Sequence, residues 1–153
     1  MTLLEFACRD HRFALPLACV RRVVPIAQPM PLPGAPEIVT GILNVGGEIV
    51  TVVDFFRRVG IPASPIQPAQ RLLMLDMAGF LVGCIVDQVQ GVTSREPDKE
   101  RGVPEPFSGA DFVDTIVRLD DGLCIIVDPE KFLFEDERTQ LGDALGKSCH
   151  ETQ

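Results

Sequence analysis

The stretch GILNVGGEIVTVVDFFRRVG, residues 41–60, contains two strand-like segments on either side of the pair Gly46-Gly47. A glycine pair between two apolar, β-branched runs is typical of a tight hairpin, because glycine readily adopts the positive φ angles of such turns. After the second run, Asp54 is a candidate N-cap for a short helix that ends at Gly60. The stretch therefore predicts a β-hairpin followed by one or two helical turns.

A recurring plan extends this prediction to the rest of the chain: a glycine, five to seven mostly apolar residues, then an aspartate. It occurs at residues 47–54, 79–87 and 122–128. A run that is apolar at successive positions indicates a strand that is covered on both faces. Because the three runs fall in both halves of the chain, they predict two small β-units that share a core, and not one open sheet.

The segments around these runs are also short and strand-like. We expect further hairpins at residues 3–17, 71–87 and 111–128, and a separate strand from Val20. The fold class predicted from the residues is therefore mainly β.

Three other segments lack the strand pattern. A second short helix is expected after Asp128, where an aspartate N-cap precedes Pro129 at the first helical position. The proline-rich residues 61–69 predict a loop that connects the two lobes. The polar residues 138–153 predict a flexible C-terminal tail behind a domain that spans residues 1–137.

Composition excludes several partners. The 153 residues include 22 Asp and Glu against 14 Lys and Arg, a net charge of −8. Nucleic-acid binding requires clustered basic residues, and the adjacent basic pairs here are only Arg21-Arg22 and Arg57-Arg58. No apolar run is long enough to cross a membrane, and the N-terminus lacks the pattern of a signal peptide. We expect a cytoplasmic protein that neither binds nucleic acid nor inserts into a membrane.

The residues that usually hold metals or perform catalysis are sparse. The five cysteines form no CxxC pair, and His11 and His150 are isolated, so we expect no metal, no cofactor and reduced thiols. Asp54, Asp87 and Asp128 end apolar strands, but none precedes the Thr-Gly or Ser-Gly that supports a catalytic aspartate. Phosphate-binding and nucleophile motifs are also missing from the sequence. The sequence predicts a binding module and not an enzyme.

Two valines near strand ends are candidates for exposed apolar contacts. Val20 and Val92 fit this role, but periodicity alone gives equal weight to ordinary core packing at both positions. A free-standing β-barrel that binds a small apolar ligand is an alternative function for such a chain.

Residues 41–60 resemble the most recognisable stretch of the CheW family of chemotaxis adaptor proteins, in which Asn-Leu-Arg-Gly leads into a strand. The similarity continues in order through four further segments. They are FALPLACVRRVVPI, LPGAPEIVTG, FLVGCIVDQVQGV and LCIIVDPEKFL. The match covers roughly residues 3–134, and the order of the five segments makes the resemblance specific.

The resemblance implies two intertwined five-stranded SH3-like β-barrel lobes with a shared hydrophobic core. It also implies a non-enzymatic scaffold that couples the cytoplasmic tips of chemoreceptors to the regulatory domain of a CheA-type histidine kinase, at membrane receptor arrays. By position in the motifs, the receptor and kinase surface would include Val20, Arg22, Asn44, Gly46 and Val92. Glycines with a structural role would be Gly41, Gly47 and Gly83.

Two positions depart from the family pattern. The arginine of Asn-Leu-Arg-Gly is Gly46 here, and the glutamate of a Val-x-Glu-Ile motif is Arg22. A missing charge and a reversed charge on a binding surface predict partners unlike those of a typical CheW. We therefore expect a divergent member of the family, serving a specialised array or a pilus-type chemosensory pathway.

Overall fold

The structure is a computed structural model that describes residues 2–62, 65–77, 79–94, 113–119, 122–131 and 135–151. Its strands are β1 Thr2–Cys8, β2 His11–Pro16, β3 Val20–Pro25, β4 Val39–Val45, β5 Glu48–Val53, β6 Arg71–Met77, β7 Phe80–Val86, β8 Gln88–Ser94, β9 Val113–Leu119 and β10 Gly122–Val127. The helical elements are the 3₁₀ turn η1 Leu17–Cys19, α1 Phe55–Arg58, the 3₁₀ turn η3 Pro129–Lys131 and α2 Glu135–Glu151. The mainly β fold predicted from the sequence is confirmed.

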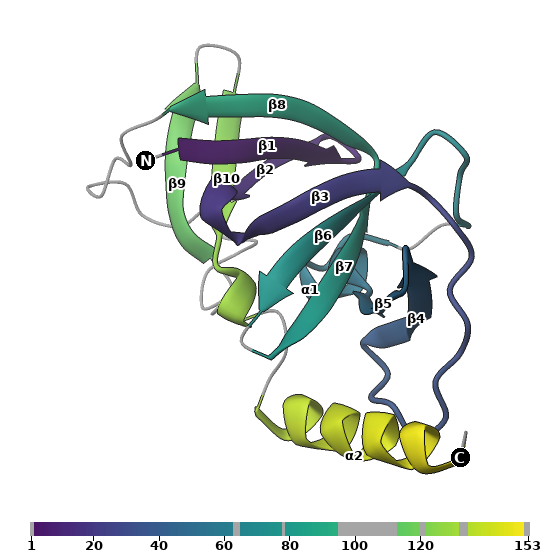
Figure 1. Ribbon diagram of the computed structural model, residues 1–153. Helices are drawn as coiled ribbons and strands as arrows, with labels where there is room; N and C mark the ends of the chain where they lie inside the picture. Colours follow the sequence, from purple (N-terminus) through teal and green to yellow (C-terminus); the bar gives the residue numbers. More distant parts are fainter. Residues whose placement is uncertain are drawn as a thin grey trace.

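The strands form two five-stranded sheets with the same internal plan (Figure 1). The first sheet has the order β8-β1-β2-β10-β9 and the second the order β3-β6-β7-β5-β4. In each sheet two antiparallel hairpins meet at one parallel pair, β2 with β10 and β5 with β7. We call the first sheet lobe 1 and the second lobe 2.

The apolar runs lie in central strands, and their alternate residues enter different cores. In β10, Ile125 and Val127 belong to a large cluster shared by both sheets, whereas Cys124 and Ile126 belong to a small cluster within lobe 1. Lobe 2 has its own cluster, which includes Val50, Val52, Leu72, Met74 and Leu81. A strand between two cores must be apolar on both faces. The predicted shared core is therefore confirmed.

The strand that follows each central hairpin leaves for the other lobe. After the hairpin of β1 and β2, η1 leads to β3, which pairs with β6 of lobe 2. After the hairpin of β6 and β7, Asp87 leads to β8, which pairs with β1 of lobe 1. Both exchanged strands are edge strands, and each takes part in a ladder with a register shift typical of a β-bulge. This exchange is the intertwining that the family resemblance implied.

The lobes are open sheets and not the closed barrels that were expected. Among the described strands, each sheet has two edge strands that pair on one side only. They are β8 and β9 in lobe 1 and β3 and β4 in lobe 2. Register shifts interrupt regular pairing along both exchanged strands, and β3 ends at Pro25, which has no N–H to donate.

The expectation that residues 61–69 connect the lobes is wrong. The strands on either side of them, β5 and β6, belong to the same sheet. The chain passes between the lobes at η1 and at Asp87 instead. Proline content identified a loop correctly here, but loop composition carries no information about which sheets the loop joins.

Both short helices begin at the predicted aspartates. The Asp54 carboxylate accepts a hydrogen bond from the Arg57 N–H at 3.1 Å and caps α1. The Asp128 carboxylate accepts one from the Glu130 N–H at 3.0 Å at the start of η3.

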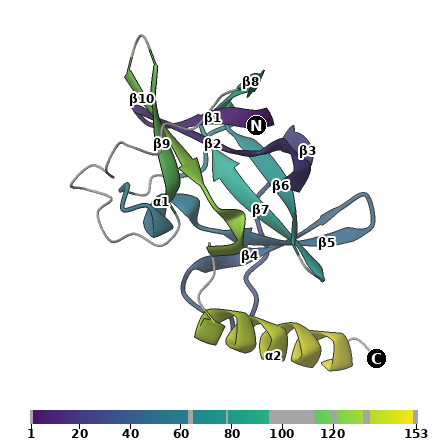
Figure 2. The same cartoon turned by 90° about the vertical axis from the view of Figure 1, so that its left-hand side faces the viewer.

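The C-terminal segment differs from the flexible tail predicted for residues 138–153, because most of it forms α2. This helix lies beneath β4 in both ribbon views (Figure 1, Figure 2). Leu141 and Ala144 are buried on one helical face. Glu137 forms a 2.5 Å ion pair with the largely buried Arg58, and the Gln140 amide donates to the Gly34 carbonyl at 3.0 Å. These contacts are with distant residues, so local composition could not reveal them.

Candidate interaction surface

The two valines predicted to make exposed contacts lie on the two exchanged strands but differ in burial. Val92 on β8 is 54% exposed. Val20, at the start of β3, is half-buried and packs against the shared core. Val92 is therefore a surface residue, whereas Val20 belongs partly to the core.

The neighbouring arginines of β3 have different environments. The register shift between Val20 and Arg22 leaves Arg21 as the extra residue of the bulge. The Arg21 guanidinium reaches Glu48 at 2.9 Å and Asp76 at 3.4 Å. Arg22 is exposed, and the described residues contain no ion pair to it. Arg21 thus holds β3 to lobe 2, while Arg22 presents a positive charge to solvent.

Sequence reasoning selected Arg22 and missed the role of Arg21. Two adjacent arginines in a strand point to opposite faces in regular geometry, and a bulge changes which face each one takes. The pair Arg21-Arg22 marked the place, but no signal in the sequence distinguishes the two side chains.

The turn between β4 and β5 is fixed by its own residues. The Asn44 side-chain oxygen accepts a hydrogen bond from the Gly47 N–H at 2.8 Å. Gly46 and Gly47 have φ angles of 60° and 90°. Side chains other than glycine rarely adopt these angles, so the turn presents backbone to solvent.

An exposed apolar patch continues from this hairpin. Ile42 pairs with Met30 on one side, and Asn44 pairs with Ile49 on the other. Ile42 and Asn44 point to the same face of β4, because they are two positions apart in the strand. On this face Ile42 packs against the shared core. Met30 and Ile49 are 66% and 51% exposed. We call Met30, Ile42, Asn44 and Ile49 the hairpin patch; sequence reasoning found only Asn44.

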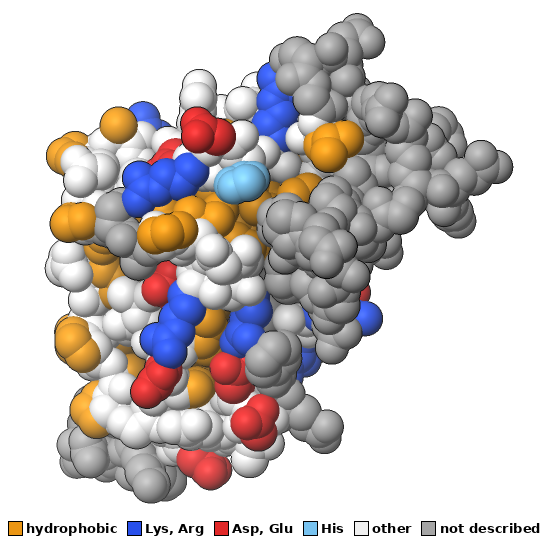
Figure 3. Space-filling view, turned by 180° about the vertical axis from the view of Figure 1, so that it is seen from behind, with side chains coloured by type: hydrophobic (Ala, Val, Ile, Leu, Met, Phe, Trp, Pro, Cys, Tyr) orange, Lys and Arg blue, Asp and Glu red, His pale blue; other side chains and the backbone are white. Residues whose placement is uncertain are grey.

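The predicted surface residues thus fall into two groups. Because Arg21 pairs with Glu48, the residue after Gly47, the structure brings the start of β3 near the β4–β5 hairpin. Val92 lies on β8 of the other sheet. Figure 3 shows acidic and basic side chains interspersed on the rear face, with hydrophobic side chains gathered along one edge.

Two of the glycines assigned a structural role are at close approaches. A Cβ on Gly41 would lie 2.3 Å from the Met30 carbonyl oxygen. A Cβ on Gly83 would lie 2.8 Å from Leu72 and 2.9 Å from Val50, in the core of lobe 2. A larger residue at either position would displace backbone or core side chains.

The ionisable groups of the described residues do not converge on a site. These residues contain no cluster of three potential metal ligands. Cys8 and Cys84 are buried, and burial raises the pKa of Cys84 to about 12, so its thiol remains protonated and unreactive. None of the helices in this part of the chain is long and apolar enough to cross a membrane.

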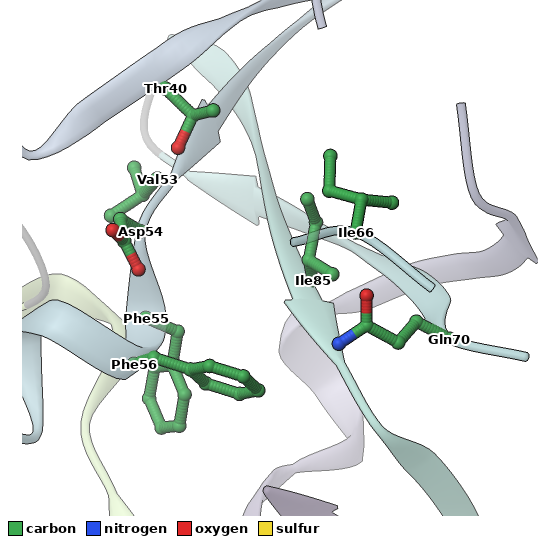
Figure 4. Close-up of a pocket in the computed structure, with 8 residues that line it drawn as sticks. All are labelled: Thr40, Val53, Asp54, Phe55, Phe56, Ile66, Gln70 and Ile85. Atoms are coloured by element: carbon green, nitrogen blue, oxygen red, sulfur yellow. The ribbon is translucent and has the colours of Figure 1, made fainter. Parts of the chain in front are cut away.

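A small pocket lies where α1 follows β5 (Figure 4). Its volume is about 110 Å³. It is lined by Thr40, Val53, Asp54, Phe55, Phe56, Ile66, Gln70 and Ile85. Pockets for drug-sized ligands have volumes of roughly 300–1,000 Å³, so this one is too small for such a ligand.

A fold of this kind, with apolar cores inside and apolar and charged groups displayed on strand edges, belongs to the class of binding modules that act through their outer surfaces.

Comparison with known proteins identifies the family within this class. The profile of the CheW-like domain matches residues 2–137. The chain is 27% identical over 117 residues to the Chemotaxis protein CheW of Rhizobium meliloti, which covers 76% of this chain and 74% of the relative. It is 30% identical over 80 residues to Protein PilI of Pseudomonas aeruginosa, covering 52% of this chain and 45% of that protein.

A solved structure agrees with the sequence relatives. The crystal structure of the scaffolding protein TtCheW from Thermoanaerobacter tengcongensis superposes with a TM-score of 0.74 at 25% identity, over 89% of this chain and 94% of that chain. The chain belongs to the CheW family, whose proteins are non-enzymatic scaffolds. Helix α2 extends past residue 137, where the match to the family profile ends.

Proposed function

We propose that this chain couples the cytoplasmic tips of chemoreceptors to the regulatory domain of a CheA-type histidine kinase. It would act in the cytoplasm, at arrays of membrane receptors. The observation that carries the proposal is the exposure of Val92 on β8, of Arg22 on β3, and of Met30 and Ile49 in the hairpin patch. The names and scaffold role of its relatives support the same assignment.

Two surfaces are needed for such coupling. We assign the receptor tip to a surface that includes both exchanged strands, with Val20, Arg22 and Val92, together with Asn44 and Gly46 of the hairpin. We assign the kinase regulatory domain to the ends of the lobes. Interfaces of about 800 Å² per partner or less correspond to micromolar contacts, about −8 kcal/mol each. Simultaneous contacts become a stable lattice, because each one raises the effective concentration of the others.

The charge pattern of the surface favours a divergent partner. Arg22 presents an exposed positive charge where the family resemblance places a glutamate, and Gly46 has no side chain where it places an arginine. A receptor tip with an acidic residue opposite Arg22 would be preferred. We propose a specialised array or a pilus-type chemosensory pathway as the setting.

Co-sedimentation tests the proposed function. Vesicle-bound receptor cytoplasmic fragments are mixed with a CheA-type kinase from the same cell, with and without this chain. We expect the kinase to sediment only when the chain is present. If the amount of sedimented kinase is the same in its absence, the coupling function is wrong. Thermal stabilisation by a small apolar metabolite, without any co-sedimentation, would favour the alternative of a ligand-binding β protein.

The charge of Arg22 provides a specificity test within the same assay. Arg22→Glu restores the sign found in the family motif, and it lies on an exposed strand position with no ion pair to lose among the described residues. We expect the variant to bind its own receptors several-fold more weakly and a tip with a basic residue more strongly. Arg57→Glu, outside this surface and at a position paired with Glu37, is the control for net charge. Equal changes in receptor affinity for Arg22→Glu and Arg57→Glu would contradict the assignment of Arg22 to the receptor surface.

A further inference from the structure

Asp87 lies at one of the two points where the chain passes between the lobes. It follows β7 of lobe 2 and precedes β8, which belongs to lobe 1. Its N–H donates to the Ala7 carbonyl at 3.0 Å, and one carboxylate oxygen accepts from the Arg9 N–H at 2.6 Å. Both of these partners are in the β1–β2 hairpin of lobe 1.

The second carboxylate oxygen of Asp87 binds the other lobe. It accepts a hydrogen bond from the Gln70 amide nitrogen at 2.8 Å, in the loop that precedes β6. Gln70 is only 4% exposed, and its amide oxygen accepts from the Gln67 N–H at 2.8 Å, which fixes the orientation of the amide. One carboxylate therefore bridges a turn of lobe 1 and a loop of lobe 2.

Arg9 strengthens the same junction from the side of lobe 1. Its φ angle of 58° turns the chain so that its N–H faces Asp87. Its guanidinium lies over the Phe56 ring of α1, 5.5 Å from the centroid, and 3.4 Å from the Pro62 carbonyl oxygen. The β1–β2 turn is thus held to lobe 2 by a side chain as well as by Asp87.

The other passage between the lobes is built differently. At η1 the N-cap position is Pro16, and no side-chain hydrogen bond caps the turn. At Asp87, by contrast, the side chain of the connecting residue itself hydrogen-bonds to both lobes. Five residues after it comes Val92, the exposed large hydrophobic residue of β8.

We propose that Asp87 is a positioning residue, which sets the orientation of β8 relative to β3 and so determines affinity for a partner that contacts both strands. The inference rests on the proposed function, in which the receptor tip is that partner. A kinase domain bound at the end of one lobe does not require this orientation. Asp87 thus controls the ratio of the two affinities and not the overall ability to bind.

A charge exchange between Asp87 and Gln70 tests the bridge. Asp87→Asn places an amide N–H₂ against one of the two donors, and Gln70→Glu places two carboxylates together. In the double variant, the oxygen of the new asparagine accepts from the Arg9 N–H, and its nitrogen donates to the carboxylate of the new glutamate. The bridge is then rebuilt with its polarity reversed. Binding of receptor tips and of the kinase regulatory domain is measured separately, at a temperature where circular dichroism shows every variant folded.

We expect each single variant to lose about tenfold in affinity for the receptor tip, the equivalent of one hydrogen bond, with kinase affinity unchanged. The double variant should recover receptor affinity. Parallel loss of both affinities, no loss in either, or no recovery in the double variant would overturn the proposal. If Asp87→Asn does not fold, Gln70→Met breaks the same hydrogen bond from the donor side at similar volume and carries the same expectation. Failure of the unmodified chain to bind receptor tips would instead refute the proposed function, which separates the two outcomes.

Discussion

The exchanged strands β3 and β8 occupy equivalent places in the two lobes but are held in different ways. Each pairs with the first strand of a central hairpin, forms one edge of its sheet and has a register shift in its ladder. β3 is held by the ion pairs of Arg21 to Glu48 and Asp76. β8 has no charged side chain and is held at its start by Asp87.

An edge strand that binds a partner must be fixed in place and must also keep its surface free for contact. An ion pair across a sheet fixes a strand but occupies part of its surface with charge. A bridge at the start of a strand fixes its direction and leaves the strand itself open to an apolar contact, as at Val92. Strands at equivalent places in the two sheets can therefore present one charged and one uncharged edge.

Thiol reactivity provides the largest expected contrast between the two passages that lead to these strands. Cys19 lies in η1 before β3 and is half-buried, whereas Cys8 lies beside Arg9 at the Asp87 junction and is fully buried. Burial raises the pKa of both thiols, and much more strongly at Cys8. We expect Cys8 to be alkylated at least about a thousandfold more slowly than Cys19 in the native state, because its exposure requires global opening.

Peptide-resolved mass spectrometry after timed alkylation at pH ~8.5, near the usual pKa of a thiol, measures both rates in the same sample. The buried Cys84 and Cys124 serve as internal references for global unfolding. Alkylation of Cys8 at the rate of Cys19 would show that the Asp87 junction opens as freely as η1.

Matched substitutions of the two valines should give the next largest effect. Val20→Asp places a charge against the shared core and should lower the free energy of unfolding by about 1–3 kcal/mol. Val92→Asp, at a position that is 54% exposed, should change it by no more than about 0.5 kcal/mol but weaken receptor capture. Urea unfolding of both variants measures the difference. Comparable destabilisation by Val20→Asp and Val92→Asp would mean that Val92 is as buried as Val20.

The smallest expected contrast is in how salt changes the stability of variants of the two neighbouring arginines of β3. Arg21→Ala removes both ion pairs of β3, whose partners are partly exposed, and should lower the free energy of unfolding by about 0.5–1 kcal/mol at low ionic strength. The loss should shrink in about 1 M salt, because screening weakens such pairs. Arg22→Ala, which loses no ion pair among the described residues, is the matched control. A larger loss for Arg22→Ala would show that the two arginines have been assigned the wrong roles.

The local features of the fold could be predicted from the sequence. The Gly46-Gly47 turn and the N-caps at Asp54 and Asp128 involve residues within three positions of one another, so a short stretch contains the whole interaction. The apolar runs also indicated strands between two cores, because burial on both faces leaves a pattern within each strand.

Features that depend on distant partners could not be predicted from the residues alone. The role of α2 depends on Gly34 and Arg58, 106 and 79 residues from their partners. The choice between Arg21 and Arg22 depends on the bulge that β3 forms against β6. The hairpin patch was missed because Met30 and Ile49 are exposed where the shared core does not reach them. The residues next to them in the sequence do not indicate this exposure.

The exchange of β3 and β8 also limits how this protein can be divided or recombined. Each central hairpin takes its outer strand from the opposite half of the chain, so a cut between β5 and β6 leaves two fragments that both lack strands of both sheets. Lobe 2 is continuous from β3 to β7, but excising it would uncover its side of the shared core and leave lobe 1 in two pieces. The whole two-lobed domain is therefore the smallest piece that evolution or an engineer can transplant intact.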